Sequence, residues 1–187
     1  MRLFIAIELP DDIRKALAHL QKELRPVTDT ARWVNPESIH ITLKFIGEVA
    51  EPKIEEIDLA IAAVSSKPLI VTVRNVGFFP GSRSPRVFWV GMEAPGMEGL
   101  AEALDTRLER IGIEKENRAF RPHITMARSR ESRIDSALVT AAAKYETHEF
   151  GSFTADRFYL VQSTLRPEGA IYNKLKEYPL ARTPLLD

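Results

Sequence analysis

One short motif occurs twice in this sequence, and the distance between the copies constrains the fold more than any other feature. His-Ile-Thr stands at residues 40–42 and again at residues 123–125, so the copies lie 83 residues apart. The composition of the chain predicts only about 0.24 His-x-Thr triplets by chance. A motif repeated at nearly half the length of the chain indicates two related halves.

The segments around the first copy alternate between strand and helix patterns. An apolar run over residues 2–9 stops at Pro10, and an amphipathic helix is predicted from Asp11 onward. A strand is predicted over about 39–46, and a second helix, a strand over 69–76 and a loop over 78–85 follow it. The first half is therefore predicted to be a strand-helix-strand-helix-strand unit.

The second half restarts this order at an offset of 84, because residues 86–90 resemble residues 2–6. The predicted elements that follow are a helix through Leu100–Ile111, the strand of the second motif, a helix near 134–143, one strand over 150–161 and a last strand over 170–178. We therefore predict a single domain built from two repeats, about 1–85 and 86–187.

Side-chain alternation in a strand places each histidine on a polar face. In the first copy, the apolar face would hold Ile39, Ile41, Leu43 and Phe45, and the polar face His40, Thr42 and Lys44. In the second copy, Pro122, Ile124 and Met126 would lie opposite Arg121, His123 and Thr125. Each copy thus offers one face to a core and one to a cleft, and a pseudo-twofold axis would bring the two imidazoles together across that cleft.

Two opposed imidazoles suit an in-line displacement at phosphorus. One histidine can remove a proton from the attacking water while the other protonates the departing sugar oxygen, because an unperturbed pKa of about 6.5 allows both roles. The hydroxyls of Thr42 and Thr125 can donate hydrogen bonds to the non-bridging phosphate oxygens. The sequence thus predicts metal-independent hydrolysis of a cyclic phosphodiester at the end of an RNA.

Composition excludes several other classes of protein. The 26 basic and 26 acidic side chains balance, which argues against a protein that coats long stretches of nucleic acid. The absence of cysteine excludes disulfides and thiolate zinc sites. No signal peptide or membrane span is predicted. We expect a cytoplasmic monomer with no cofactor.

Cationic and aromatic residues near the motifs are candidates for binding the substrate. Lys44 has the correct parity, and further cations crowd around the second motif, namely Arg118, Arg121, Arg128, Arg130 and Arg133. Arg128 has the wrong parity and would reach the cleft only if its strand ended or bulged after Thr125. Three aromatic residues could stack on a base or belong to the core: Phe4, its predicted equivalent Phe88, for which the core is favoured, and Trp33.

The other two histidines have no partner motif. His19 lies in a helical stretch and His148 precedes a predicted strand, so both are expected on the surface. A metal site at His40 and His123 would need further ligands at ordered spacings, and none stands out. We therefore predict no metal ion.

The chain resembles the two-histidine phosphoesterase superfamily, and most closely its RNA 2′,3′-cyclic phosphodiesterases, also called 2′-5′ RNA ligases or LigT-like proteins. The segments that carry this resemblance are Arg2–Ile7, His40–Glu48, Arg121–Arg128 and Ser163–Tyr172. The resemblance implies a bilobal α+β fold, with two pseudo-symmetric antiparallel sheets and outer helices around a central cleft. Met126 stands where leucine is more usual in the family.

The resemblance also implies an activity and roles for individual residues. The activity is the opening of an RNA-terminal 2′,3′-cyclic phosphate to a 2′-phosphate, with a reverse reaction that joins RNA ends through a 2′-5′ linkage. It makes His40 the proton donor, His123 the proton acceptor and Arg128 a phosphate ligand, whereas the chemistry of the two similar halves leaves the acid and base labels open. Three alternatives remain: a small nucleotide or 2′-5′ oligonucleotide as substrate, a catalytically silent module that binds RNA ends, and a metal-dependent phosphodiesterase.

Overall fold

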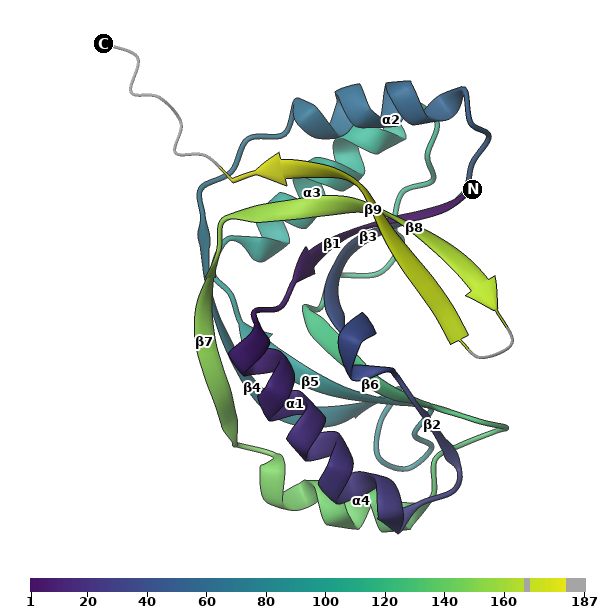
Figure 1. Cartoon of the computed structure of the whole chain (residues 1–187), viewed down its shortest axis with the longest axis vertical. Helices are drawn as coiled ribbons and strands as arrows, with labels where there is room; N and C mark the ends of the chain where they lie inside the picture. The colour runs from purple at the N-terminus through teal and green to yellow at the C-terminus, as the bar shows by residue number, and fades with distance from the viewer. Residues whose placement is uncertain (167–168, 181–187) are drawn as a thin grey trace.

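The computed structural model describes residues 1–166 and 169–180, and its strands form two antiparallel sheets within these residues (Figure 1). The first sheet has the order β3 (His40–Glu48), β1 (Arg2–Glu8), β8 (Arg157–Arg166) and β9 (Gly169–Pro179). The second sheet has the order β2 (Ala31–Trp33), β6 (His123–Ser129), β5 (Val87–Glu93), β4 (Leu69–Phe79) and β7 (Glu149–Ala155). The two motifs therefore begin strands of different sheets.

The helices lie in two pairs, one beside each sheet (Figure 1). They are α1 (Asp11–Leu24), α2 (Lys53–Ala62), α3 (Met97–Glu109) and α4 (Ser136–Ala142). Helices α2 and α3 pack on each other and α3 contacts β3, whereas α1 contacts α4 and β7. Among the residues described, no helix combines the length and the apolar character needed to cross a membrane.

One continuous core joins the two sheets and the helices. Helix α1 contributes to it through Ile13, Leu17, Leu20 and Leu24, which recur at helical spacing and are at most 2% exposed. A second, smaller apolar cluster of Phe4, Ala6 and Val161 lies apart from this core, on strands of the first sheet. The first sheet therefore carries a small apolar cluster of its own, separate from the main core.

The predicted α+β fold with two antiparallel sheets and flanking helices is confirmed, and three of its elements differ in detail. The run over 150–161 contains two strands, β7 and β8, which belong to different sheets. The short strand β2 was not predicted, and β4 continues into the predicted loop as far as Phe79.

Each sheet takes strands from both halves of the chain. The first sheet places β1 and β3 beside β8 and β9, and the second places β2 and β4 beside β5, β6 and β7. The two halves are therefore interleaved and do not form one sheet each. The division into repeats of about 1–85 and 86–187 stays a prediction.

Candidate active site

Both motif strands carry a β-bulge directly after the threonine. On β3, the register to β1 jumps from Thr42 to Lys44 and leaves Leu43 without a partner. On β6, the register to β5 jumps in the same way over Met126, which lies 83 residues after Leu43. A bulge adds one residue to one strand and so turns the side chains that follow it to the opposite face. The two motifs therefore share their backbone irregularity as well as their residues.

Lys44 lies in the core as a result of this bulge. Its side chain is 4% exposed, its Nζ lies 2.6 Å from a carboxylate oxygen of Asp105 on α3, and it also donates to the carbonyl oxygen of Glu114 at 2.6 Å. The prediction that Lys44 shares the face of His40 and Thr42 is wrong, because simple alternation ends at the bulge. Lys44 is thus unavailable as a phosphate ligand.

Because of the bulges, the side chains of Phe45 and Arg128 lie on the same strand faces as the His and Thr of their motifs. Phe45 is 57% exposed and was predicted in the core, which is wrong for the same reason. Arg128 is exposed, and its positive charge is one cause of the lowered pKa of His123, so its guanidinium lies near that imidazole. The bulge that Arg128 required in order to reach this face is present.

The two histidines are held by the same local hydrogen bond. Nδ1–H of His40 donates to the carbonyl oxygen of Ser38 at 2.8 Å, and Nδ1–H of His123 donates to that of Arg121 at 2.7 Å. A carbonyl oxygen can only accept, so Nδ1 carries the proton in both rings. In the neutral imidazole, Nε2 is then the unprotonated nitrogen, ready to accept a proton from a ligand.

Aromatic rings support each imidazole. The ring of Phe4 stacks on His40 with centroids 4.8 Å apart, and Tyr172 of β9 meets the same imidazole edge-on at 5.2 Å. Phe79 meets His123 edge-on at 5.0 Å. Phe4 is 4% exposed, so its ring supports His40. One of the two predictions for Phe4 was that it stacks on a base, and its buried ring offers no free face for that.

Burial lowers the pKa of both histidines below their ordinary value. For His40, desolvation is the main cause, and the hydrogen bond to Ser38 opposes it. For His123, desolvation again lowers the pKa, the hydrogen bond to Arg121 opposes it, and the charge of Arg128 lowers it further. Near neutral pH both free imidazoles are therefore mostly uncharged.

The two motif strands meet at the boundary between the sheets. β3 contacts β6 although the two belong to different sheets. Thr42 and Thr125 are half-buried, and in the described part of the chain neither hydroxyl has a hydrogen-bond partner. The structure thus brings neighbouring strands together that each carry one imidazole and one available hydroxyl.

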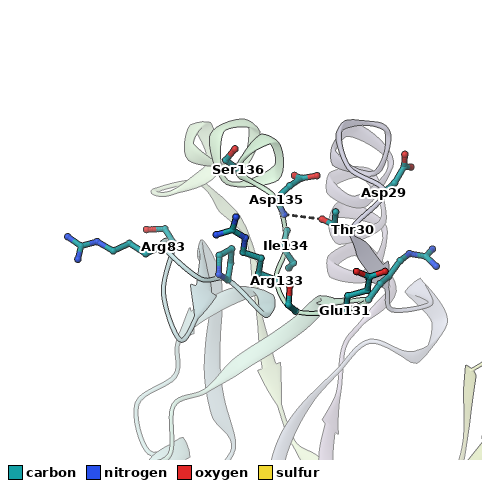
Figure 2. Close-up of a pocket in the computed structure, with 12 residues that line it drawn as sticks. Asp29, Thr30, Arg83, Glu131, Arg133, Ile134, Asp135 and Ser136 are labelled. Atoms are coloured by element: carbon teal, nitrogen blue, oxygen red, sulfur yellow. Dashed lines mark hydrogen bonds between the residues drawn. The ribbon is translucent and has the colours of Figure 1, made fainter.

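Two of the remaining predicted arginines line a cavity, and the other two lie in the segment before β6. Arg130 and Arg133 line a cavity of about 510 Å³ together with Arg83, and this cavity also contains the carboxylates of Asp29, Glu131 and Asp135. Figure 2 shows Arg83 pointing away from Arg133, and the backbone N–H of Asp135 donating to the hydroxyl of Thr30. The cavity balances its charges, so it does not form a concentrated basic surface. Arg118 and Arg121 are exposed in the segment before β6.

The second-half equivalent of Phe4 is Val87, not Phe88. Phe4 pairs with Phe45, and Val87 pairs with Arg128, which gives an offset of 83 in place of the predicted 84. Phe88 is fully buried, so its favoured place in the core is confirmed. Trp33 packs edge-on against Phe88 at 6.0 Å and is a neighbour of the core.

The other two histidines are on the surface, as predicted. His19 is exposed and lies 3.3 Å from a carboxylate oxygen of Glu23, and His148 is exposed beside the ring of Phe150. Within residues 1–166 and 169–180, no group of three or more His, Asp or Glu side chains is arranged to hold a metal ion.

Three residues near the motifs were missed from the sequence: Phe45, Tyr172 and Phe79. The repeat itself was the signal for Phe45, because Phe45 lies 83 residues before Arg128. A bulge shared by the two strands turns both side chains to the face of their histidine. Tyr172 and Phe79 reach the imidazoles from β9 and β4, and nothing in the local sequence indicates those long-range contacts.

Comparison with known proteins agrees with this geometry. The family model described as LigT like Phosphoesterase matches the chain twice, over residues 7–89 and 90–172. Proteins named RNA 2′,3′-cyclic phosphodiesterase from Archaeoglobus fulgidus and Methanocaldococcus jannaschii are each 35% identical to it, over 95% of this chain and 99% and 100% of theirs.

Solved structures show the same fold. The crystal structure of Escherichia coli LigT complexed with 3′-AMP is 30% identical, has a TM-score of 0.79, and the match covers 97% of this chain and 98% of that one. A Thermus thermophilus protein of known structure is 32% identical with a TM-score of 0.80, and the match covers 96% of this chain and 98% of that one. The repeated motif, the shared bulges and these matches lead to one assignment: the chain belongs to the LigT-like phosphoesterase family.

Proposed function

We propose that this protein hydrolyses the 2′,3′-cyclic phosphate at the end of an RNA to a 2′-phosphate. The observation that carries the proposal is the matched pair of imidazoles, each with Nδ1–H fixed on a carbonyl oxygen, which leaves Nε2 as the nitrogen that can exchange a proton with the substrate. The names of the Archaeoglobus and Methanocaldococcus relatives, which share a third of the sequence over nearly its whole length, support the same activity.

In this mechanism His123 is the base and His40 the acid. Nε2 of His123 removes a proton from water, and the water oxygen attacks phosphorus. The bond from phosphorus to the 3′ oxygen breaks while His40, which enters this step as the charged imidazolium, gives its Nε2 proton to that oxygen. The hydroxyls of Thr42 and Thr125 and the guanidinium of Arg128 stabilise the charge that develops on the non-bridging oxygens. The products are a 2′-phosphate and a 3′-hydroxyl.

Arg128 supports these labels, which the symmetry of the sequence left open. Its cation lies near His123 and favours the uncharged form of that imidazole, the form in which a base begins the reaction. Its counterpart in the first half, Phe45, exerts no such effect on His40. The asymmetry between the two halves thus favours His123 as the proton acceptor.

Ligation follows the same path in this proposal. The 5′-hydroxyl of a second RNA takes the place of water, and its attack with loss of the 3′ oxygen leaves a 2′-5′ linkage. We further propose that the protein acts as a cytoplasmic monomer on RNA ends and needs no metal ion. A small cyclic nucleotide is the second candidate substrate, and the structure of the similar Escherichia coli LigT in complex with the mononucleotide 3′-AMP favours it.

The proposal is tested with an oligonucleotide that ends in a 2′,3′-cyclic phosphate, incubated with the protein in EDTA. We expect undiminished turnover and a product that carries only a 2′-phosphate, because the two imidazoles supply both proton transfers. The cyclic mononucleotide, assayed beside it, gives the relative kcat/KM. Loss of activity in EDTA, restored by a divalent metal, would support the metal-dependent alternative, and a preference for the mononucleotide would contradict the RNA-end assignment.

We expect the pH profile of kcat/KM to be bell-shaped, with its maximum below pH 6.5, the ordinary pKa of histidine. The base must be unprotonated and the acid protonated, and burial lowers the pKa of both imidazoles, so both limbs shift to lower pH. The Arg128→Met variant removes a cause of the low pKa of His123. Since His123 is the proposed base, the acidic limb of the profile should shift to higher pH.

Arg121→Met is the matched control for this measurement. Arg121 is an exposed arginine two residues from His123 whose charge is not among the causes of the pKa shift, so this profile should keep its shape. A maximum above pH 6.5 would contradict the lowered pKa values of the two histidines. Equal shifts in both variants would contradict the electrostatic role of Arg128.

A further inference from the structure

Two glycines on neighbouring strands leave room for the indole of Trp89 to lie against the second sheet. A Cβ added to Gly77 of β4 would stand 2.3 Å from Cζ2 of Trp89, and one added to Gly91 of β5 would stand 3.1 Å from its Cζ3. Carbon atoms that are not bonded to each other stay about 3.5–4.0 Å apart. The indole therefore occupies the space that a side chain at position 77 would need.

Trp89 lies beside the second motif. In the register of β5 with β6, Trp89 is paired with Thr125, and Gly91 is paired with His123. In the register of β4 with β5, Trp89 is paired with Gly77. Residues that are paired across two strands share a face of the sheet. The glycines and the indole are therefore on the face that carries the motif.

Phe79 connects this indole to the imidazole of the proposed base. The ring of Phe79 lies 5.2 Å from that of Trp89, with 33° between the planes, and it meets His123 edge-on at 5.0 Å. Both distances lie within the range of about 4.5–7 Å that is favourable for aromatic pairs. The glycine thus admits the indole, the indole packs on the phenyl ring, and the phenyl ring covers one side of the imidazole.

The polar atom of Trp89 is left without a partner in this packing. Its Nε1 is buried and has no hydrogen-bond acceptor within residues 1–166 and 169–180. A buried donor without an acceptor destabilises the folded protein, and a purely apolar ring would avoid that penalty. The stability of the sheet alone therefore does not account for an indole at this position.

We propose that Gly77 is a positioning residue for His123: the space that it leaves for the neighbouring indole keeps the ring of Phe79 in contact with the imidazole. Nδ1–H of His123 donates to the carbonyl oxygen of Arg121, which holds one atom of the ring. An edge-on phenyl ring limits the tilt that a single hydrogen bond leaves open. This inference rests on the proposed function, in which His123 is the base.

The same contact belongs to the burial that lowers the pKa of His123. β5 and β4 face this imidazole with Gly91 and Phe79, which do not titrate. Arg128 of β6 lowers the same pKa through its charge, and β3, which contacts β6, carries the other imidazole, His40. Loss of the phenyl contact should therefore raise the pKa of His123 toward its ordinary value while the charged neighbours stay in place.

The Gly77→Ala variant tests the proposal, because its methyl group displaces the indole and, through it, the phenyl ring. On a cyclic-phosphate-ended RNA, kcat should fall about 10- to 100-fold, the effect of a misplacement of about 1 Å. KM should change little, because no contact to the substrate is removed. NMR titration of the His123 imidazole, which requires no turnover, should give a raised pKa. Gly77→Ala combined with Trp89→Phe should recover much of kcat and the lower pKa, because the smaller ring leaves room for the methyl group.

Gly99→Ala is the matched control, because a Cβ added at Gly99 of α3 meets no atom within 4 Å. This variant should change neither kcat nor the pKa of His123. Phe79→Ala removes the last contact of the series without crowding the sheet, so it should raise the same pKa even if Gly77→Ala does not fold.

Two results would overturn the inference. One is a Gly77→Ala protein that is less stable but keeps kcat and the pKa of His123, since Gly77 would then serve only the packing of the sheet. The other is an unchanged pKa of His123 in Phe79→Ala. Absence of hydrolysis by the unmodified protein would instead refute the proposed function, and the NMR titration would still decide whether the phenyl contact controls the imidazole.

Discussion

Replacing His40 or His123 by alanine is expected to lower kcat on a cyclic-phosphate-ended RNA by about 10²- to 10⁴-fold. Each substitution removes one of the two proton transfers, because each imidazole is fixed at its own place by a hydrogen bond to a backbone carbonyl oxygen. The double variant should lose less than the product of the single losses, because the two residues act as a unit. Single-turnover hydrolysis of a labelled RNA measures the chemical step directly.

His19→Ala is the matched control, because this exposed histidine lies on α1 and its removal should leave turnover unchanged. Binding of an RNA that ends in a 2′-phosphate should survive in both motif variants, since Arg128 and the threonine hydroxyls remain. Equal turnover in the unmodified protein and the double variant would contradict an acid–base role. It would favour the alternative of a silent module that binds RNA ends.

The Lys44→Met variant is expected to be less stable by about 3–5 kcal/mol, because it leaves the carboxylate of Asp105 buried without its cation. Asp105 also accepts hydrogen bonds from the backbone N–H of Glu116, and Lys44 holds the carbonyl oxygen of Glu114. The pair therefore fixes the segment between α3 and the second motif onto the strand of the first. Urea unfolding followed by circular dichroism measures the loss.

Two further variants make this prediction specific. Lys44→Met combined with Asp105→Asn removes both charges and keeps an acceptor for Glu116, so it should recover most of the stability. Lys53→Met breaks a largely exposed ion pair with Glu56 and should cost no more than about 1 kcal/mol. A loss in Lys44→Met as small as that in Lys53→Met would show that the buried pair is dispensable.

The sequence predicted the faces of the motif residues as far as strand alternation holds. His40 and Thr42 precede the bulge on β3, and His123 and Thr125 precede the one on β6, so local periodicity was sufficient for all four. Periodicity failed two and three residues after the first threonine, at Lys44 and Phe45. Lys44 was placed on the wrong face, because a bulge depends on the pairing with β1 and leaves no mark in the strand that carries it.

Contacts between distant segments account for the other differences. The run over 150–161 is continuous in its apolar pattern, but β7 pairs with β4 and β8 pairs with β1, so the chain changes sheets within it. Tyr172 reaches His40 because β9 pairs with β8, which in turn pairs with β1. Such neighbours are set by the topology, and periodicity in one segment does not encode them.

The central place of β1 in the first sheet has a consequence for the biosynthesis of this protein. β1 is among the first segments to leave the ribosome, and β3 can pair with one of its edges early, whereas the other edge must wait for β8, which is made about 150 residues later. During that interval the nascent chain presents an unpaired apolar edge, the kind of surface that chaperones bind and that promotes aggregation. Completion of the first sheet, and with it the final surroundings of His40, is therefore a late event in translation.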